Sequence, residues 1–422
     1  MAKIVKIWAR EILDSRGIPT IESMCQLDSG HVAVSSVPSG ASTGTYEALE
    51  LRDADPQRYK GKGVLKAVDN LNKVLGPAVI GMDPSDQDAI DKKLIALDGT
   101  ENKTKLGANS ILAVSEVVCK TAAMANGMPL YKWIMSLAQK KQIPVNLDIP
   151  TPLFNMINGG LHGAGNLDFQ EFWVIPAKSK TFSEGIQAGV EIYLGLGENL
   201  LRRGAIHSVG DEGGYAPNLF TNADALEILV ETIRQSSYGL GRDLFLGLDV
   251  AANVLYKDGK YVIRDKSAPM DEATLIEYYK ELNSNYNLEI LEDPLQEDAW
   301  SGWRQLSQTI GGQVSIVGDD LLVTNPKRVE KAITEKACNS ILVKPNQIGT
   351  ITETLDVIKK GRDAKWGIII SHRSGETNDS FIADFGVGVD ADYVKFGAPA
   401  RGERVAKYNR LMGIEKELAA GK

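Results

Sequence analysis

Ionisable side chains follow six short apolar runs in the last two thirds of the chain, and they come as three acids and then three bases. In chain order these residues are Asp249, Glu292, Asp319, Lys344, His372 and Lys395. Successive members are 23 to 43 residues apart, close to the roughly 30 residues that one strand and one helix occupy in an eight-stranded α/β barrel. Because the carboxyl ends of parallel barrel strands open onto one face, the order predicts a single pocket with a metal-binding half and a basic half.

The three acids are hard oxygen ligands. Asp249, Glu292 and Asp319 would leave coordination positions open for water and substrate, which suits Mg²⁺, whereas zinc favours His and Cys. Each acid taken alone has another interpretation, because strand-end acids often cap the next helix or pair with a lysine. The occurrence of all three in order, opposite bases, favours the metal.

Lys344 and Lys395 are candidate bases at the ends of apolar strands. An ordinary lysine with a pKa near ~10.4 is protonated at neutral pH, so a useful base needs a pKa lowered by ~3 units. Burial beside metal cations disfavours the ammonium form and would lower the pKa in this way. For either lysine alone, the alternative is a salt bridge to a strand-end acid.

Two histidines lie in turns rich in glycine or serine, His162 in NGGLHGAGN and His372 in SHRSGET. Such surroundings favour a place in a pocket over a place on an apolar face. Arg373 and Ser374 follow His372 directly. A guanidinium, a hydroxyl and the amides of a turn together can bind an oxyanion or a phosphate, although Arg373 alone could belong to a surface ion pair.

The segment VPSGASTGTYEALELRD, residues 37–53, is rich in glycine, serine and threonine. Gly40 and Gly44 allow it to move, so we expect a lid that excludes water when it closes. It lacks the lysine of a Walker A motif and is therefore not a P-loop. GLGENL, at 195–200, has Leu200 where a dinucleotide fingerprint needs glycine, so a nicotinamide cofactor is not supported.

Length and patterning predict two domains in the 422 residues. Residues 1–140 alternate at first and then become helical, which indicates a small α+β domain that carries the lid. Prolines gather around residues 141–152, where we expect the crossover. Residues 141–422 are long enough for an α/β barrel of the (β/α)8 type. Strand-like stretches that end at Glu171 and Glu212 bring the candidate barrel strands to eight.

Composition is that of an ordinary soluble globular protein, with 43% hydrophobic and 24% charged residues. The net charge of −8 argues against nucleic-acid and anionic-membrane partners. Three widely spaced cysteines fit no metal motif and suggest free thiols in a reducing compartment. Charges interrupt every apolar stretch near the N-terminus. These features lead us to expect a cytoplasmic protein.

Ordered motifs along nearly the whole chain resemble those of the enolase family. The matching stretches are ILDSRG, VPSGASTG, EALELRD, LGANSIL, INGG with His162, FQEF, VGDEGGYAP, LEDPL, VGDDLLVTN, NQIGTITET, SHRSGET and KYNRL. The resemblance implies the fold of a barrel preceded by a smaller domain. It also implies Mg²⁺-dependent interconversion of 2-phosphoglycerate and phosphoenolpyruvate through an enolate, with two Mg²⁺ per active site.

The resemblance also implies roles for individual residues. Asp249, Glu292 and Asp319 would hold the first metal, and Ser42 would help to hold the second. Lys344 would remove the proton beside the substrate carboxylate, and Glu212 would protonate the departing hydroxyl. The remaining residues would surround the substrate or assist catalysis, with Arg373 and Ser374 gripping the phosphate: His162, Gln170, Glu171, His372, Arg373, Ser374 and Lys395.

The chain departs from the family pattern at Ile18, Ala113, Gly402 and Gly413. Gly413 stands where many members carry an arginine that crosses the dimer interface. A homo-oligomer, either a dimer or an octamer, is expected. Two alternatives remain: another dehydratase or racemase of the wider superfamily, and a non-catalytic interaction or structural protein that keeps the fold.

Overall fold

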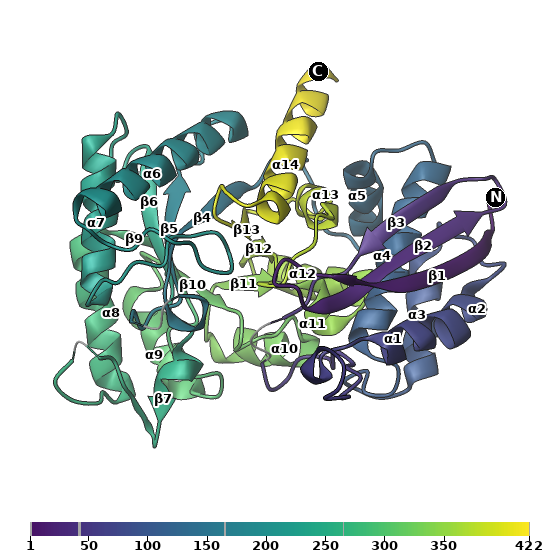
Figure 1. Cartoon of the computed structure of the whole chain (residues 1–422), viewed down its shortest axis with the longest axis horizontal. Coiled ribbons are helices and arrows are strands. Elements are labelled where there is room, and N and C mark those ends of the chain that lie inside the picture. The colour runs from purple at the N-terminus through teal and green to yellow at the C-terminus, as the bar shows by residue number, and fades with distance from the viewer. Residues whose placement is uncertain (1, 41–43, 164–165, 265, 422) are drawn as a thin grey trace.

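The computed structural model describes residues 2–40, 44–163, 166–264 and 266–421. Ser42, the predicted ligand of a second metal, and part of the predicted lid lie outside these ranges. In Figure 1 a three-stranded sheet with its helices forms one end of the molecule, helices α7 and α8 form the other, and the barrel strands lie between them.

The chain begins with an antiparallel sheet of β1 (Ile4–Leu13), β2 (Pro19–Leu27) and β3 (Val32–Ser36). Alternating side chains of β2 are buried against α4 (Ala108–Ala125), a helix with a largely buried surface. Further helices complete this part of the chain: α1 (Leu65–Asn70), η2 (Leu71–Leu75, a π-helical turn), α2 (Gly76–Val79), α3 (Gln87–Asp98) and α5 (Leu130–Lys140), after the short turn η1 (Tyr59–Gly61). The small α+β arrangement expected from the sequence is confirmed.

Eight strands form a closed barrel. In order around it they are β4 (Thr151–Asn158), β5 (Glu171–Pro176), β6 (Leu244–Asp249), β9 (Leu288–Glu292), β10 (Ser315–Gly318), β11 (Ser340–Val343), β12 (Gly367–Ser371) and β13 (Tyr393–Gly397). Apolar side chains from seven of these strands fill the interior: Leu153, Trp173, Ile175, Ile290, Val317, Leu342, Ile369 and Tyr393. The barrel is therefore a packed core and not a pore, so a ligand must bind at its mouth.

Helices surround the barrel and bury their apolar faces against it. They are α6 (Phe182–Arg202), α7 (Asn222–Gln235), α8 (Glu272–Tyr286), α9 (Trp300–Ile310), α10 (Pro326–Glu335), α11 (Pro345–Ile348), α12 (Ile351–Asp363), α13 (Phe381–Gly388) and α14 (Gly402–Ala420). Two short turns, η3 (Gly160–His162) and η4 (Ala252–Leu255), and a small hairpin of β7 (Tyr256–Lys257) and β8 (Lys260–Tyr261) lie in the connections.

One strand runs against the others, which corrects the expectation of an all-parallel barrel. β5 is antiparallel to both β4 and β6. The connection from β4 to β5 contains only the turn η3 and no helix that could return the chain to the other end of the barrel, so β5 starts where β4 stops. Glu171 is consequently the first residue of its strand and not the last, yet it lies at the same mouth.

Two further strand predictions were wrong in detail. Glu212 is not at the end of a barrel strand but in the loop between α6 and α7. The strand missing from the sequence-based count is β4, which begins among the prolines assigned to the crossover and contains Pro152. Lys395 lies in the middle of β13, followed by a register shift before Gly397.

The N-terminal part of the chain is joined to the barrel side of the molecule by hydrogen bonds and an ion pair. Backbone hydrogen bonds join Ser39 and Gly375 in both directions, at 2.8 and 3.0 Å. Buried Lys103 pairs with Glu353 of α12 at 3.0 Å. The start of the 37–53 segment therefore lies beside the turn that follows β12.

Within the described residues, no single helix has both the length and the apolar character needed to cross a membrane. Among the described helices, one consecutive pair, α4 with α5, has enough length and apolar character when taken together, and this pair is bent by 107°.

Candidate active site

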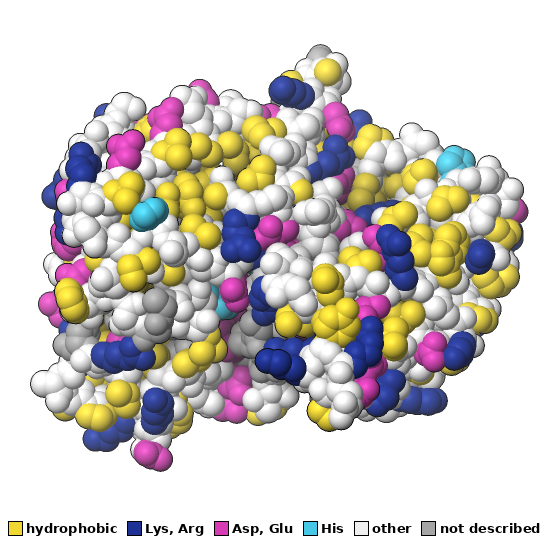
Figure 2. Space-filling view, in the orientation of Figure 1, with side chains coloured by type: hydrophobic (Ala, Val, Ile, Leu, Met, Phe, Trp, Pro, Cys, Tyr) yellow, Lys and Arg dark blue, Asp and Glu magenta, His cyan; other side chains and the backbone are white. Residues whose placement is uncertain are grey.

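A cavity of about 510 Å³, counted with its open mouth, lies at the ends of the barrel strands. Its walls contain every sequence-predicted site residue that the structure describes except Glu292: His162, Gln170, Glu171, Glu212, Asp249, Asp319, Lys344, His372, Arg373, Ser374 and Lys395. In Figure 2 acidic and histidine side chains are visible together at the hollow near the middle of this face. Convergence of these residues on one pocket is thus observed.

Lys395 lies at the centre of three carboxylates. Its Nζ is 2.9 Å from oxygens of Glu171, Asp249 and Glu292, and all four side chains are almost completely buried. Burial lowers the pKa of Lys395, but the three acids outweigh it and raise the pKa well above its usual value. Burial raises the pKa values of Glu171 and Glu292. This cluster gathers three carboxyl groups around a single ammonium group.

Lys344 follows β11 and contacts the carboxylate of Asp319. The other oxygen of Asp319 accepts a hydrogen bond of 3.0 Å from Gln347 Nε2. Burial lowers the pKa of Lys344, yet Asp319 raises it, and the net direction is upward. The protein groups alone therefore do not lower the pKa of Lys344 as expected from the sequence. That lowering stays a prediction that requires bound cations to neutralise the acids.

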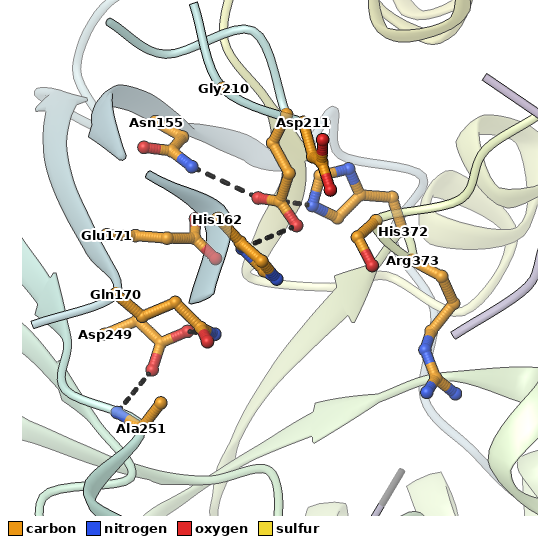
Figure 3. A network of polar contacts seen from close by, with 12 residues as sticks. Asn155, His162, Gln170, Glu171, Gly210, Asp211, Asp249, Ala251, His372 and Arg373 are labelled. Atoms are coloured by element: carbon orange, nitrogen blue, oxygen red, sulfur yellow. Dashed lines mark hydrogen bonds and ion pairs between the residues drawn. The ribbon is translucent and has the colours of Figure 1, made fainter. Parts of the chain in front are cut away.

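Three side chains lie close to Glu212: Asn155, His162 and His372, all labelled in Figure 3. Asn155 donates to its Oε2 at 3.1 Å. His372 Nε2 lies 3.3 Å from the same oxygen, and His162 Nδ1 lies 3.4 Å from Oε1. Burial raises the pKa of Glu212, but its neighbours, His372 first, bring it well below the usual value. Burial also lowers the pKa of His372 to about 3, so Glu212 is ionised and His372 neutral near pH 7.

Arg373 meets an acid of the N-terminal part of the chain. Its Nη1 is 3.0 Å from Glu47 Oε2 and 3.1 Å from Asn346 Oδ1, and Arg373 and Glu47 are buried. Neighbouring Ser374 accepts a hydrogen bond of 3.4 Å from Arg16. The turn after β12 thus gathers positive charge and a hydroxyl at one edge of the cavity, opposite the acid cluster.

Two protein-family models match the chain and together cover most of it. The model described as "Enolase, N-terminal domain" matches residues 4–134, and the model described as "Enolase, C-terminal TIM barrel domain" matches residues 146–422. The chain belongs to the enolase family. Membership confirms the relationship and the two-part fold inferred from the motifs, and it supports a function within the enolase superfamily. The predicted boundary near residue 140 stays a prediction.

The acids of this enolase-family site fit a divalent cation. Among the described residues, carboxylate oxygens of Glu292, Asp293 and Asp319 lie within 4.8 Å of one another. Both oxygens of Asp293 accept backbone amides, from Asp319 at 2.9 Å and Asp320 at 2.7 Å, so Asp293 shapes the loop. Glu292 Oε2 is buried without a hydrogen-bond partner. Mg²⁺ prefers oxygen ligands, carboxylates among them. A carboxylate oxygen without a hydrogen-bond partner, close to other acids, is therefore suited to bind it.

Asp249, the remaining predicted ligand, is not part of the group formed by Glu292, Asp293 and Asp319. Asp249 and Glu292 both form an ion pair with Lys395. Its two oxygens accept hydrogen bonds from Ala251 N at 3.0 Å and Gln170 Nε2 at 3.1 Å. The structure therefore brings Asp249 to the site, while its role as a ligand remains a prediction. The same holds for the roles assigned to the other site residues.

Sequence reasoning missed four residues that shape this enolase site: Asn155, Glu47, Asp293 and Arg404. Glu47 and Asp293 lie inside motifs that carry the family resemblance, EALELRD and LEDPL, and Arg404 ends the RGER stretch. Motif membership was thus an available signal for these three. Asn155 lies within β4, an unpredicted strand, and had no such signal.

Proposed function

We propose that this protein is a phosphopyruvate hydratase that interconverts 2-phosphoglycerate and phosphoenolpyruvate. The observation that carries the proposal is the meeting, in one cavity, of an acid cluster, buried lysines, a glutamate close to two histidines, and an arginine beside a serine. 2-Phosphoglycerate presents a carboxylate, a phosphate, a proton on carbon 2 and a hydroxyl on carbon 3. The cavity has a group suited to each.

Lys344 is proposed to take the proton from carbon 2. That proton is weakly acidic because its removal adds negative charge beside a carboxylate. Bound Mg²⁺, held by Asp249, Glu292 and Asp319, would supply the positive charge that offsets this cost. A lysine base with one or two Mg²⁺ ions is the general pattern of the enolase superfamily, not a deduction from this structure. Lys395, which contacts Asp249 and Glu292, adds the positive charge of its ammonium group to that of the bound metal.

Glu212 is proposed to handle the hydroxyl on carbon 3. In the dehydration direction the carbon–oxygen bond breaks, the oxygen takes a proton from Glu212 and leaves as water, and the electron pair left on carbon 2 forms the double bond. Because Glu212 is ionised in the free protein, it must gain a proton before this step. In the hydration direction the ionised form is ready to accept a proton from water.

Arg373 and Ser374 are proposed to bind the phosphate. A guanidinium can bind phosphate through two parallel hydrogen bonds. Glu47 already contacts Arg373 Nη1 at 3.0 Å, so the phosphate must share or displace this carboxylate. Thr45 and Tyr46 hydrogen-bond to Glu297 and Asp298 at 2.7 and 2.9 Å, which supports the proposal that the 37–53 segment closes over the site.

The test is to supply 2-phosphoglycerate and Mg²⁺ and to follow the ultraviolet absorbance of the conjugated product. We expect turnover, and we expect the same turnover from His207→Gln, which changes an exposed histidine away from the cavity. Silence with 2-phosphoglycerate but activity on acid sugars would favour another dehydratase of the superfamily. Silence with both would favour a non-catalytic protein and contradict the proposal.

We also propose a cytoplasmic homo-oligomer. Cys25, Cys119 and Cys338 are buried free thiols, which is compatible with a reducing compartment. Sedimentation would distinguish a dimer from an octamer, and a monomer at micromolar concentration would contradict this part of the proposal.

A further inference from the structure

Arg404 is a fully buried cation in the first turn of α14 that none of the proposed chemical steps uses. Its guanidinium reaches toward the turn after β12. Nη1 donates to the carbonyl of Arg373 at 2.8 Å, and Nη2 donates to the carbonyls of Ser374 and Asp211 at 2.6 and 3.1 Å. Arg404 therefore joins the proposed phosphate-binding turn to the loop that carries Glu212.

The same Nη1 lies 2.8 Å from Nδ1 of His372. A guanidinium has donors only and stays protonated. The His372 Nδ1 must therefore be the acceptor, so in the neutral imidazole the proton is on Nε2. That nitrogen lies 3.3 Å from Glu212 Oε2. The contact with Arg404 thus places the ring proton of His372 on Nε2, the nitrogen that faces Glu212.

The other tautomer would place two lone pairs against each other, because an unprotonated Nε2 would face an ionised carboxylate. With the proton on Nε2, the positive edge of the His372 ring lies 3.3 Å from Glu212 Oε2, the oxygen to which Asn155 donates at 3.1 Å. The other oxygen, Oε1, lies 3.4 Å from His162 Nδ1.

Close packing leaves these groups little room to rearrange. Gly397 has a φ of +88°, and a Cβ there would lie 2.7 Å from the carbonyl oxygen of Glu212 and 3.1 Å from both Arg404 Cδ and His372 Cε1. Only glycine allows the helix arginine, the histidine ring and the Glu212 loop to approach this closely. The arrangement is therefore built into the end of β13.

We propose that Arg404 is a positioning residue that fixes His372 as the Nε2-protonated tautomer and so orients Glu212. The role in orienting a proton-transfer group rests on the proposed function. The tautomer assignment itself does not, and the two can be tested separately.

The first experiment measures the ring nitrogens of His372 by long-range proton–nitrogen NMR. The chain has only four histidines, and loss of one set of signals in His372→Gln assigns the ring. We expect the native protein to show an unprotonated Nδ1 and a protonated Nε2. A proton on Nδ1 in the native protein would overturn the proposal, whatever the protein catalyses.

Variants then test whether Arg404 causes this tautomer of His372. Arg404→Met removes the donor, and we expect the His372 signals to shift toward a mixture of tautomers. The control is Lys407→Met, which removes another fully buried cation of α14. Lys407 pairs with Glu376 at 2.8 Å and donates to the carbonyls of Thr377 and Glu403, and none of these contacts is to a histidine ring. An unchanged tautomer in folded Arg404→Met, or an equal shift in Lys407→Met, would overturn the proposal.

The second experiment separates orientation from simple support of the backbone. Removing partners that orient functional histidines costs roughly 10- to 100-fold, and we expect a loss of kcat in this range for Arg404→Met with a smaller change in KM. In a His372→Gln background, where the amide has no tautomers, the same change should cost much less. Equal losses in both backgrounds would show a purely structural role and overturn the proposal.

Discussion

Glu171, the first residue of β5, pairs directly with Asp249, the last residue of β6. The pairing exists because β5 is antiparallel to its neighbours, so its amino end lies where the carboxyl ends of the other strands lie. Two buried carboxylates are thereby placed side by side, and Lys395 Nζ contacts both at 2.9 Å. The reversal of one strand thus brings an additional acid into the cluster without an additional strand.

Lys344→Ala should abolish exchange of the proton on carbon 2 of 2-phosphoglycerate with deuterated water. The substitution removes the amine that is proposed to accept this proton. General bases typically contribute about 10²- to 10⁴-fold to a rate. Mass spectrometry of recovered substrate measures the exchange. If the variant exchanged the proton at the native rate, the assignment of the base would be wrong.

Glu212→Gln should separate the two halves of the reaction. The amide keeps the shape of the side chain but has no proton to give to the departing hydroxyl, so dehydration should stop while exchange at carbon 2 continues. Parallel measurement of absorbance and deuterium content tests this. A variant that lost both activities together would argue that Glu212 acts before or during proton removal.

Glu292→Gln should weaken Mg²⁺ binding by more than the roughly 10- to 100-fold that loss of a hydrogen-bonding partner of a metal ligand costs, because it removes the charge of a proposed ligand. Without the metal, its folding stability should change little, because burial, followed by the charge of Asp249, raises the pKa of Glu292 and already favours its neutral form. Calorimetric titration with Mg²⁺ measures the affinity.

Glu289→Gln is the matched control, because Glu289 lies on the same strand and hydrogen-bonds to Tyr393 at 3.0 Å. Equal weakening in both variants would mean that the loss is not specific to the proposed ligand.

Asp91→Asn should reveal a pH-dependent contribution to stability where α3 meets α12. Asp91 accepts hydrogen bonds from Gln87 at 3.0 Å and from the backbone of Thr352 at 2.9 Å, and burial raises its pKa to about 6. A raised pKa in the folded state gives stability that is present below the ordinary value near 4 and is lost as the pH rises through 6.

Relative to the native protein, Asp91→Asn should therefore gain about 2 to 3 kcal/mol in the free energy of unfolding between pH 4 and pH 7, since one pKa unit corresponds to about 1.4 kcal/mol. Urea unfolding at both pH values measures this difference. A constant difference between variant and native protein would contradict the raised pKa.

Much of the site could be predicted because its residues follow apolar strands in chain order. Asp249, Glu292, Asp319, Lys344 and His372 each end or directly follow a strand, and strand position alone brought them to one mouth. The glycine- and serine-rich composition of their turns, and not the strand pattern, indicated His162, Arg373 and Ser374.

The direction of β5 and the identity of β4 could not be predicted from periodicity. A short buried strand has the same apolar pattern in either direction, and proline at the start of β4 resembled a linker. Contacts such as those of Arg404 with His372, or of Glu47 with Arg373, join residues far apart in sequence. They arise from tertiary packing, which no local pattern records.

The most direct test of the central claim is turnover of 2-phosphoglycerate by the native protein after chelator treatment and again after Mg²⁺ is restored. We predict no detectable product from the stripped protein and full recovery with Mg²⁺, because the buried acids need cations before Lys344 can act as a base. Equal turnover in the stripped and the Mg²⁺-loaded protein would contradict the account.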